Sequence, residues 1–181
     1  RISLSYELDG QLREVRREGR PQAGKRSLQQ YEYNARGQIT GIVDGNRNQI
    51  SYDVDNWGRI TGIRFADDVK EGYEYTPAGQ VSRAVDGNGN SVQYHYNSFG
   101  KVSERIDQLG YKESFRYDEE GNLALHIDRD GRRLQRVCNV FGKPVYEKAT
   151  DAEGKNPSIS TWHYDSLGRL SRAVGDGHSY E

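Results

Sequence analysis

Four histidines and a single cysteine are the residues best suited to bind a metal or to act as a base or nucleophile. They are His95, His126, His163, His178 and Cys138. His95 and His163 lie five residues before a glycine, at a position that is mostly polar elsewhere in the chain. No carboxylate or second cysteine recurs around them at ligand spacing, so we interpret them as solvated or paired across strands. Cys138 has no neighbouring His or Lys to activate its thiol, which favours a small buried hydrophobe.

Two acidic segments imitate the start of a calcium-binding loop. They are Asp44-x-Asn46-x-Asn48 and Asp86-x-Asn88-x-Asn90. A calcium loop has Gly at its sixth and Glu at its twelfth position, and these segments have neither, so a turn explains them better. Gly87-Asn88-Gly89 precedes no helical pattern and is not a phosphate-binding loop. Carboxylates are numerous, but nothing pairs two of them as an all-β hydrolase would require. We predict no enzymatic activity, no cofactor and no metal site.

Composition narrows the class of protein further. The 181 residues carry 26 Lys and Arg against 27 Asp and Glu, which gives no basic surface for nucleic acid. Apolar residues make up 33% of the chain, and no apolar run approaches the roughly 20 residues of a membrane-spanning helix. One cysteine excludes an internal disulfide, and 13 Tyr argue against a disordered chain. Met is absent and neither end looks capped, so we expect an interior segment of a larger protein.

A repeat of 21 residues runs along the chain. Its glycines are Gly10, Gly37, Gly58, Gly79, Gly100, Gly121, Gly142 and Gly168. Two longer intervals contain insertions near 17–24 and 150–157. The residue four before each glycine, here called the column tyrosine, is Tyr6, Tyr33, Val54, Tyr75, Tyr96, Tyr117, Cys138 or Tyr164. The residue two after each glycine is Leu12, Ile39, Ile60, Val81, Val102, Leu123, Pro144 or Leu170. These columns predict about eight structurally equivalent units in residues 1–181.

Each unit reads as two β-strands. Apolar and polar residues alternate around the glycine, and a period of two is typical of a strand. Asp or Asn three residues before the glycine favours a hairpin tip, as in Asp165-Ser166-Leu167-Gly168. We therefore predict an all-β fold with roughly 16 strands by this strand-and-turn count.

Equivalent units require equivalent neighbours, which favours a continuous spiralling antiparallel sheet over a propeller, whose inner and outer strands differ. The two faces should differ as well. One face would carry the tyrosine and aliphatic columns. The other would carry the residues that follow the glycines, such as Gln38, Arg59, Gln80 and Lys101.

The segment Tyr164-Asp165-Ser166-Leu167-Gly168-Arg169-Leu170 resembles the YD repeat of the Rhs family, and similar copies cover nearly the whole chain. The resemblance implies a wall segment of a hollow β-shell, like those of bacterial Rhs proteins, toxin-complex components and teneurins. It also implies flanking YD repeats, an enclosed C-terminal toxin domain as partner, and a secreted or cell-surface parent protein. From the charge balance and the lack of a long apolar run, we expect no nucleic-acid partner and no membrane insertion of this segment. Val54, Cys138 and Pro144 depart from the repeat pattern.

A hairpin-repeat module that binds glycan or cell-wall ligands remains the alternative function. Such modules hold sugars or quaternary amines in aromatic cages between hairpins. Trp57 and Trp162 lie in different columns, so the sequence shows no repeated cage.

Overall fold

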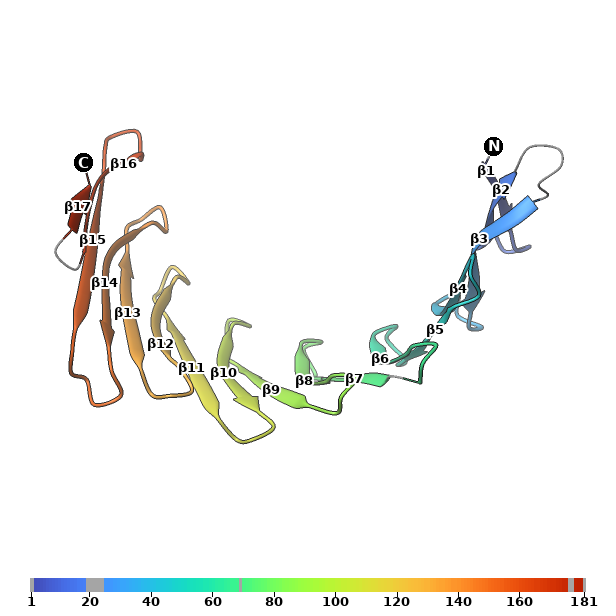
Figure 1. Cartoon of the computed structure of the whole chain (residues 1–181), viewed down its shortest axis with the longest axis horizontal. Coiled ribbons are helices and arrows are strands. Elements are labelled where there is room, and N and C mark those ends of the chain that lie inside the picture. The colour runs from blue at the N-terminus through green and yellow to red at the C-terminus, as the bar shows by residue number, and fades with distance from the viewer. Residues whose placement is uncertain (1, 19–24, 69, 176–177, 181) are drawn as a thin grey trace. The chain divides into compact units, whose positions relative to one another are not determined.

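The computed structural model describes residues 2–18, 25–68, 70–175 and 178–180, and in these ranges the chain forms strands and turns without any helix (Figure 1). The strands are β1 (Ile2–Tyr6), β2 (Leu12–Glu18), β3 (Lys25–Tyr33), β4 (Ile39–Asp44), β5 (Gln49–Val54), β6 (Ile60–Arg64), β7 (Lys70–Tyr75), β8 (Val81–Val85), β9 (Ser91–Tyr96), β10 (Val102–Asp107), β11 (Lys112–Tyr117), β12 (Leu123–Ile127), β13 (Arg133–Cys138), β14 (Pro144–Thr150), β15 (Ser158–Tyr164), β16 (Leu170–Gly175) and β17 (His178–Tyr180). The all-β prediction is confirmed, and the short β17 is the one strand beyond the expected number.

The strands fall into two compact units, Arg1–Ser91 and Val92–Glu181. Within each unit, consecutive strands pair antiparallel in chain order, as β3 with β4 and β4 with β5 in the first, and β10 with β11 and β11 with β12 in the second. The turns of such a meander lie in two rows, one at each end of the strands. We call the row that carries the eight repeat glycines the tyrosine edge, and the opposite row the far edge. The 17–24 insertion lies mostly outside the described residues, whereas the later one forms the turn after Thr150, at the far edge.

The hairpin tips at both edges have the same type of turn. In the tip of the β3–β4 hairpin, the amide of Gly37 donates to the Asn34 carbonyl at 2.9 Å, and the amide of Asn34 donates to the Gln38 carbonyl at 2.9 Å. The Asn34 side-chain oxygen accepts from the amides of Arg36 and Gln38, which closes an Asx turn. All eight repeat glycines have a φ between +73° and +89°, a region that residues with a Cβ rarely adopt.

The strand register places the two apolar columns opposite each other in each hairpin. Tyr33 pairs with Ile39 and Tyr117 pairs with Leu123, and in both hairpins the register shifts by one residue just before the tyrosine. This bulge recurs in the hairpins of both units, for example between Glu74 and Tyr75. An extra residue on one strand increases the local twist, so each hairpin twists at the same place.

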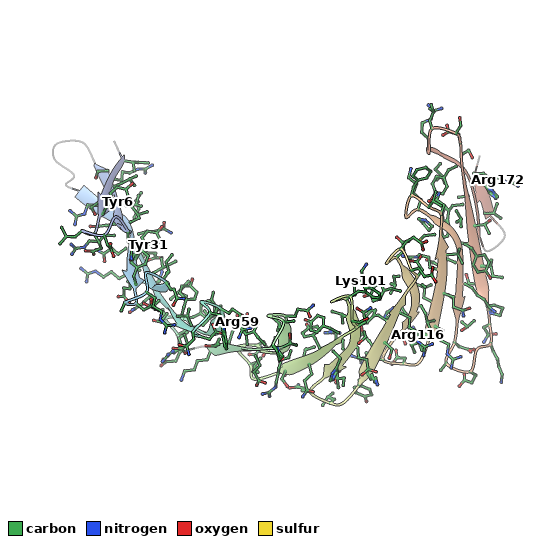
Figure 2. The ribbon with its side chains drawn as sticks, turned by 180° about the vertical axis from the view of Figure 1, so that it is seen from behind. Tyr6, Tyr31, Arg59, Lys101, Arg116 and Arg172 are labelled. Atoms are coloured by element: carbon green, nitrogen blue, oxygen red, sulfur yellow. The ribbon has the colours of Figure 1, made fainter. Side chains whose placement is uncertain are left out.

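The ribbon is one layer thick, and side chains project from both of its faces (Figure 2). No apolar side chain in the described ranges is buried, and the buried charged residue is Glu14, with 4% of its surface exposed. Arg16 binds the Glu14 carboxylate at 2.6 Å, and Gln30 donates to it at 3.4 Å. Without a second layer to pack against, the ribbon depends on ladder bonds, turn bonds and contacts between neighbouring hairpins.

Candidate functional site

The places where one hairpin meets the next are the most regular side-chain arrangement in the chain. We call such a strand pair, joined at the far edge and open at the tyrosine edge, a seam. In the β10–β11 seam the ladder begins at Ile106 opposite Lys112 and ends at Glu104 opposite Ser114. The ladder therefore stops before the tyrosine edge, where β10 starts at Val102 and β11 ends at Tyr117.

Column tyrosines bridge these open ends. The hydroxyl of Tyr117 donates to the Val102 carbonyl at 2.9 Å, across the part of the seam where the ladder is absent. The same bond joins Tyr33 to Leu12 at 2.8 Å, Tyr75 to Ile60 at 2.6 Å and Tyr164 to Pro144 at 2.9 Å. In each case the acceptor is the aliphatic residue two positions after the preceding glycine. The tyrosine thus supplies the cross-strand bond that the backbone does not make there.

A cation from the preceding hairpin covers several of these rings. The Lys101 ammonium lies 5.1 Å from the ring centroid of Tyr117 and donates to the Gly121 carbonyl of the next tip. Lys143 repeats both contacts with Tyr164 and Gly168. The Arg59 guanidinium lies 4.5 Å from the ring centroid of Tyr75. We call the combination of tyrosine hydroxyl bond and overlying cation a staple.

The staple corrects the face assignment made from sequence. Arg59 and Lys101 were expected on the face opposite the tyrosines, because they alternate with the aliphatic column. They belong to the turn rather than to a strand, so strand alternation does not apply to them, and their side chains lie over the rings of Tyr75 and Tyr117.

Lys101→Gln is therefore expected to lower the free energy of unfolding by about 0.5–1.5 kcal/mol, because glutamine has no charge to place over the ring. Urea denaturation of the two proteins measures this difference. The matched control is Lys155→Gln, at an exposed tip of the far edge, where a change below about 0.5 kcal/mol is expected. An equally small effect at Lys101 would show that the cation does not stabilise the seam.

The histidines and the cysteine considered for metal or nucleophile chemistry do not come together. His95 and His163 are exposed, Cys138 is half-buried opposite Pro144, and the side chain of His178 lies outside the described residues. His126 stacks on Phe115 with ring centroids 4.8 Å apart. Across the described ranges, no three His, Cys, Asp or Glu residues gather as a metal-binding group.

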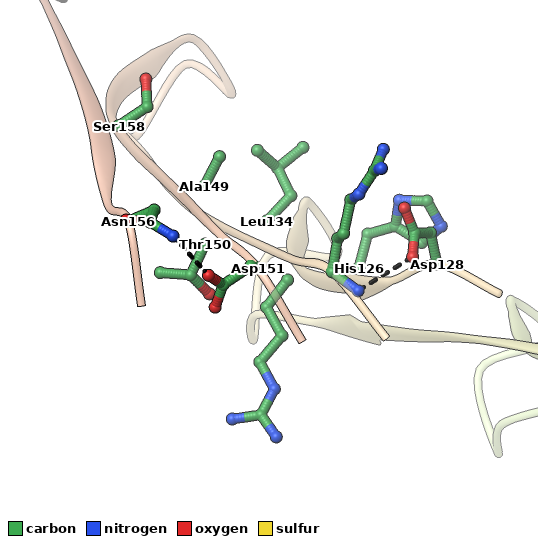
Figure 3. Close-up of a pocket in the computed structure, with 10 residues that line it drawn as sticks. His126, Asp128, Leu134, Ala149, Thr150, Asp151, Asn156 and Ser158 are labelled. Carbon is green, nitrogen blue, oxygen red and sulfur yellow. Dashed lines mark hydrogen bonds between the residues drawn. The ribbon is translucent and has the colours of Figure 1, made fainter. Parts of the chain in front are cut away.

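His126 also lines a hollow of about 400 Å³ near the far edge (Figure 3). Leu134 and Ala149 form its apolar part, while Asp128 and Asp151 lie at its rim. Both carboxylates are already engaged, Asp128 by the amide of Arg132 at 2.9 Å and Asp151 by the side chain of Asn156 at 2.7 Å. Both carboxylates therefore help to hold their own turns.

The calcium-like segments act as turn caps. Asp86 accepts bonds from the amides of Asn88 and Asn90 and from the Asn90 side chain. That side-chain bond, followed by the backbone bonds, holds the pKa of Asp86 below its usual range. A side-chain bond from Asn122 does the same for the pKa of Asp118. The aspartates cap turns at both edges.

Acid is expected to destabilise the ribbon through these caps. A carboxyl whose pKa is lower in the folded chain stabilises the fold above its unfolded pKa of about 3.9, and that stabilisation is lost as the pH falls through the folded pKa. The melting temperature should thus be flat from about pH 7 to pH 5 and fall below about pH 4. Asp118→Asn, which keeps an acceptor oxygen without a charge, should lose less on acidification. A decline that begins between pH 7 and pH 5 would contradict this assignment.

Exposed aromatic residues mark alternate tips of the tyrosine edge. Trp57, Phe99 and Phe141 each precede the repeat glycine and are 79%, 87% and 79% exposed. A hollow of about 610 Å³ lies beside Trp57 and Tyr75. The Arg59 guanidinium lies over both of these rings, 4.8 Å from the Trp57 centroid and 4.5 Å from that of Tyr75. The cation occupies the position that a sugar or quaternary amine would take in an aromatic cage.

The sequence contains a signal for the staple that the sequence analysis did not recognise. Where the residue after the glycine is Arg59, Lys101 or Lys143, the next 21-residue repeat has a tyrosine in its column. Where that residue is Gln38 or Asn122, the next repeat has Val54 or Cys138 instead.

In the described ranges, no helix is long and apolar enough to cross a membrane.

Comparison with known proteins identifies the fold family. The family model of the teneurin YD-shell matches residues 1–180. The crystal structure of TcdB2-TccC3 superposes with a TM-score of 0.82 at 12% identity and covers 97% of this chain and 11% of its own. That of TcdB2-TccC3-TEV gives a TM-score of 0.81 at 12% identity, with 97% and 10% covered. A Photorhabdus luminescens Tc holotoxin pore structure gives 0.72 at 13% identity, with the same coverage.

The chain spans about a tenth of the length of these solved structures, and no curated protein matches it. A family match over nearly the whole length, together with the hairpin register and the 21-residue period, means that the chain belongs to the teneurin YD-shell family.

Proposed function

We propose that this chain is a stretch of the wall of an Rhs-type β-shell that encloses a C-terminal toxin domain. Its role as part of a structural shell follows from its family. The enclosed toxin, the flanking YD repeats, the absence of catalytic activity and a secreted or cell-surface parent belong to the proposal. The repeat positions carrying it are Tyr33, Gly37, Ile39, Gly58, Ile60, Tyr75, Gly79, Val81, Tyr96, Gly100, Val102, Tyr117, Gly121, Leu123, Tyr164, Gly168 and Leu170.

The stapled seam is the observation that supports a wall most directly. A barrier has to be continuous between hairpins as well as within them, and the backbone ladder ends before the tyrosine edge. The hydroxyls of Tyr75 and Tyr117 bond across the open strands at that place. In a shell, closing the open end of each seam between neighbouring hairpins would keep a cargo inside and exclude a protease.

Exposure at the tips also supports a place within a larger assembly. Phe99, Phe141 and Leu167 leave 87%, 79% and 75% of their surface open to water. Large apolar side chains recur at several tips of this edge, and a surface of this kind is a candidate for cover by another part of a protein. In the proposed wall, adjoining repeats of the same shell would cover this edge.

Limited proteolysis of the full-length parent protein tests the proposal. We expect the domain that follows the repeats to resist a protease that digests the same domain when it is expressed alone. Tyr117→Asp, which puts a charge where the staple lies, should make the enclosed domain digestible. The control is Tyr111→Asp at the far-edge tip, where the tyrosine is 49% exposed. Equal digestion of the domain inside and outside the unaltered parent would contradict enclosure.

The glycan-binding alternative receives less support. The hollow beside Trp57 has the aromatic rings of a cage, but Arg59 already covers both. Glycan array binding that is saturable and is lost in Trp57→Ala would favour this alternative over the wall.

A further inference from the structure

The β12–β13 seam differs from the seams on either side of it in the second unit. In the β10–β11 seam, Tyr117 and Lys101 form a staple. In the β14–β15 seam, Tyr164 and Lys143 form one. At the corresponding positions of the β12–β13 seam stand Cys138 and Asn122. Cysteine has no ring and no hydroxyl to reach across the open strands, and asparagine carries no cation.

Asn122 does not replace the missing bond. Its side-chain amide donates to Asp118 of its own tip at 3.0 Å. Its oxygen would lie 3.0 Å from a Cβ built on Gly142, so the two tips are close together. Among the described residues of the 118–122 and 139–143 tips, no side-chain hydrogen bond joins one tip to the other.

The β4–β5 seam of the first unit also lacks a column tyrosine, but it has a substitute for the staple. Val54 stands in the tyrosine column at the β4–β5 seam, where Gln38 precedes it. There the Arg36 guanidinium donates to both the backbone and the side-chain oxygen of Asn56, at 3.0 and 3.2 Å, and ties the two tips together. The β12–β13 seam therefore lacks both the staple and the substitute.

Two further features weaken the same strands. Nε2 of His126 on β12 is buried without a hydrogen-bond partner and lies 3.8 Å from the Glu113 carboxylate. An unsatisfied buried polar atom costs free energy that opening to water recovers. The second feature lies in the β13–β14 hairpin. There the last residue of β13, Cys138, lies opposite Pro144 of β14, which has no N–H to donate to the ladder.

We propose that the β12–β13 seam is a weak point built into the second unit, and that it opens locally before the stapled seams on either side. The opening starts at the tyrosine edge, because the turn after Ile127 joins the two strands at the far edge. This inference concerns the ribbon itself and stands whether or not the ribbon encloses a cargo.

Hydrogen exchange of the full chain, followed by mass spectrometry at neutral pH, tests the proposal. Amides of 123–127 and 133–138 should exchange about tenfold faster than those of 102–107 and 112–117, since low-stability segments open first. Asn122→Lys combined with Cys138→Tyr installs the staple and should slow the β12–β13 exchange to the rate of the β10–β11 seam.

The matched control is Asn122→Lys combined with Val137→Tyr. It adds the same residue types but places the tyrosine on the opposite face of β13, where Val137 is 54% exposed, and should leave the exchange unchanged. Equal exchange of the two seams in the unaltered chain would overturn the proposal, as would a folded staple variant that exchanges as fast as the unaltered chain. If the staple variant does not fold, Tyr117→Phe decides instead. It must raise the β10–β11 exchange, and unchanged exchange there overturns the proposal.

Discussion

Tyr117→Ala is expected to lower the free energy of unfolding by about 2–3 kcal/mol. The change removes the hydroxyl bond to the Val102 carbonyl and the ring beneath the Lys101 ammonium. It leaves the β10–β11 seam with the ladder that stops at Glu104 and Ser114, two ion pairs between the strands and the bond from Lys101 to the next tip. Urea unfolding followed by circular dichroism measures the loss.

Two variants separate the parts of this effect. Tyr117→Phe keeps the ring and removes only the hydroxyl, so it should cost about 1 kcal/mol. Tyr111→Ala removes a tyrosine that is 49% exposed at a far-edge tip, where the Arg129 guanidinium lies over its ring, and should cost less than Tyr117→Ala. If the alanine variant at 117 lost no more stability than the phenylalanine variant, the ring would contribute nothing to the seam.

Gly121→Val is expected to destabilise the chain by about 1–3 kcal/mol. Gly121 has a φ of +85°, which a β-branched residue adopts only with strain. A Cβ built there would also lie 2.6 Å from the Lys101 ammonium, so the valine would displace the staple. Thermal unfolding of both proteins under identical conditions measures the effect.

Gly87→Ala is the matched control for Gly121→Val. Gly87 lies in the turn that Asp86 caps, where the positive φ belongs to Gly89 instead, so an alanine at 87 is tolerated sterically. Both residues are glycines in hairpin turns, but only Gly121 has a positive φ. Similar losses at both would mean that the left-handed glycine is not what the repeat requires.

Local chemistry made the hairpins predictable from sequence. In six of the eight tips an Asp or Asn opens the turn and the glycine follows three residues later, so their spacing alone specifies the turn. In the structure this turn brings Tyr33 opposite Ile39. The far edge was harder to predict, because the left-handed residue of its turns is Arg47 in one tip and Asp68 in another.

The seams could not be predicted because they join residues of neighbouring hairpins. Lys101 and Tyr117 are 16 positions apart, and only the three-dimensional stacking of hairpins brings the ammonium over the ring. Strand alternation misplaced Lys101 because the turn, and not the strand, orients its side chain. In the sequence the tyrosine column marked a face. In the structure, tyrosines of this column such as Tyr33 and Tyr117 form the bond that holds their hairpin to the previous one.

The structure of the full-length parent protein, determined by electron cryomicroscopy, is the most direct test of the central claim. We predict that residues 1–181 form part of a closed wall, with stapled seams along the tyrosine edge and the C-terminal domain inside. A map in which these hairpins form an open ribbon, with the terminal domain outside it, would contradict the account.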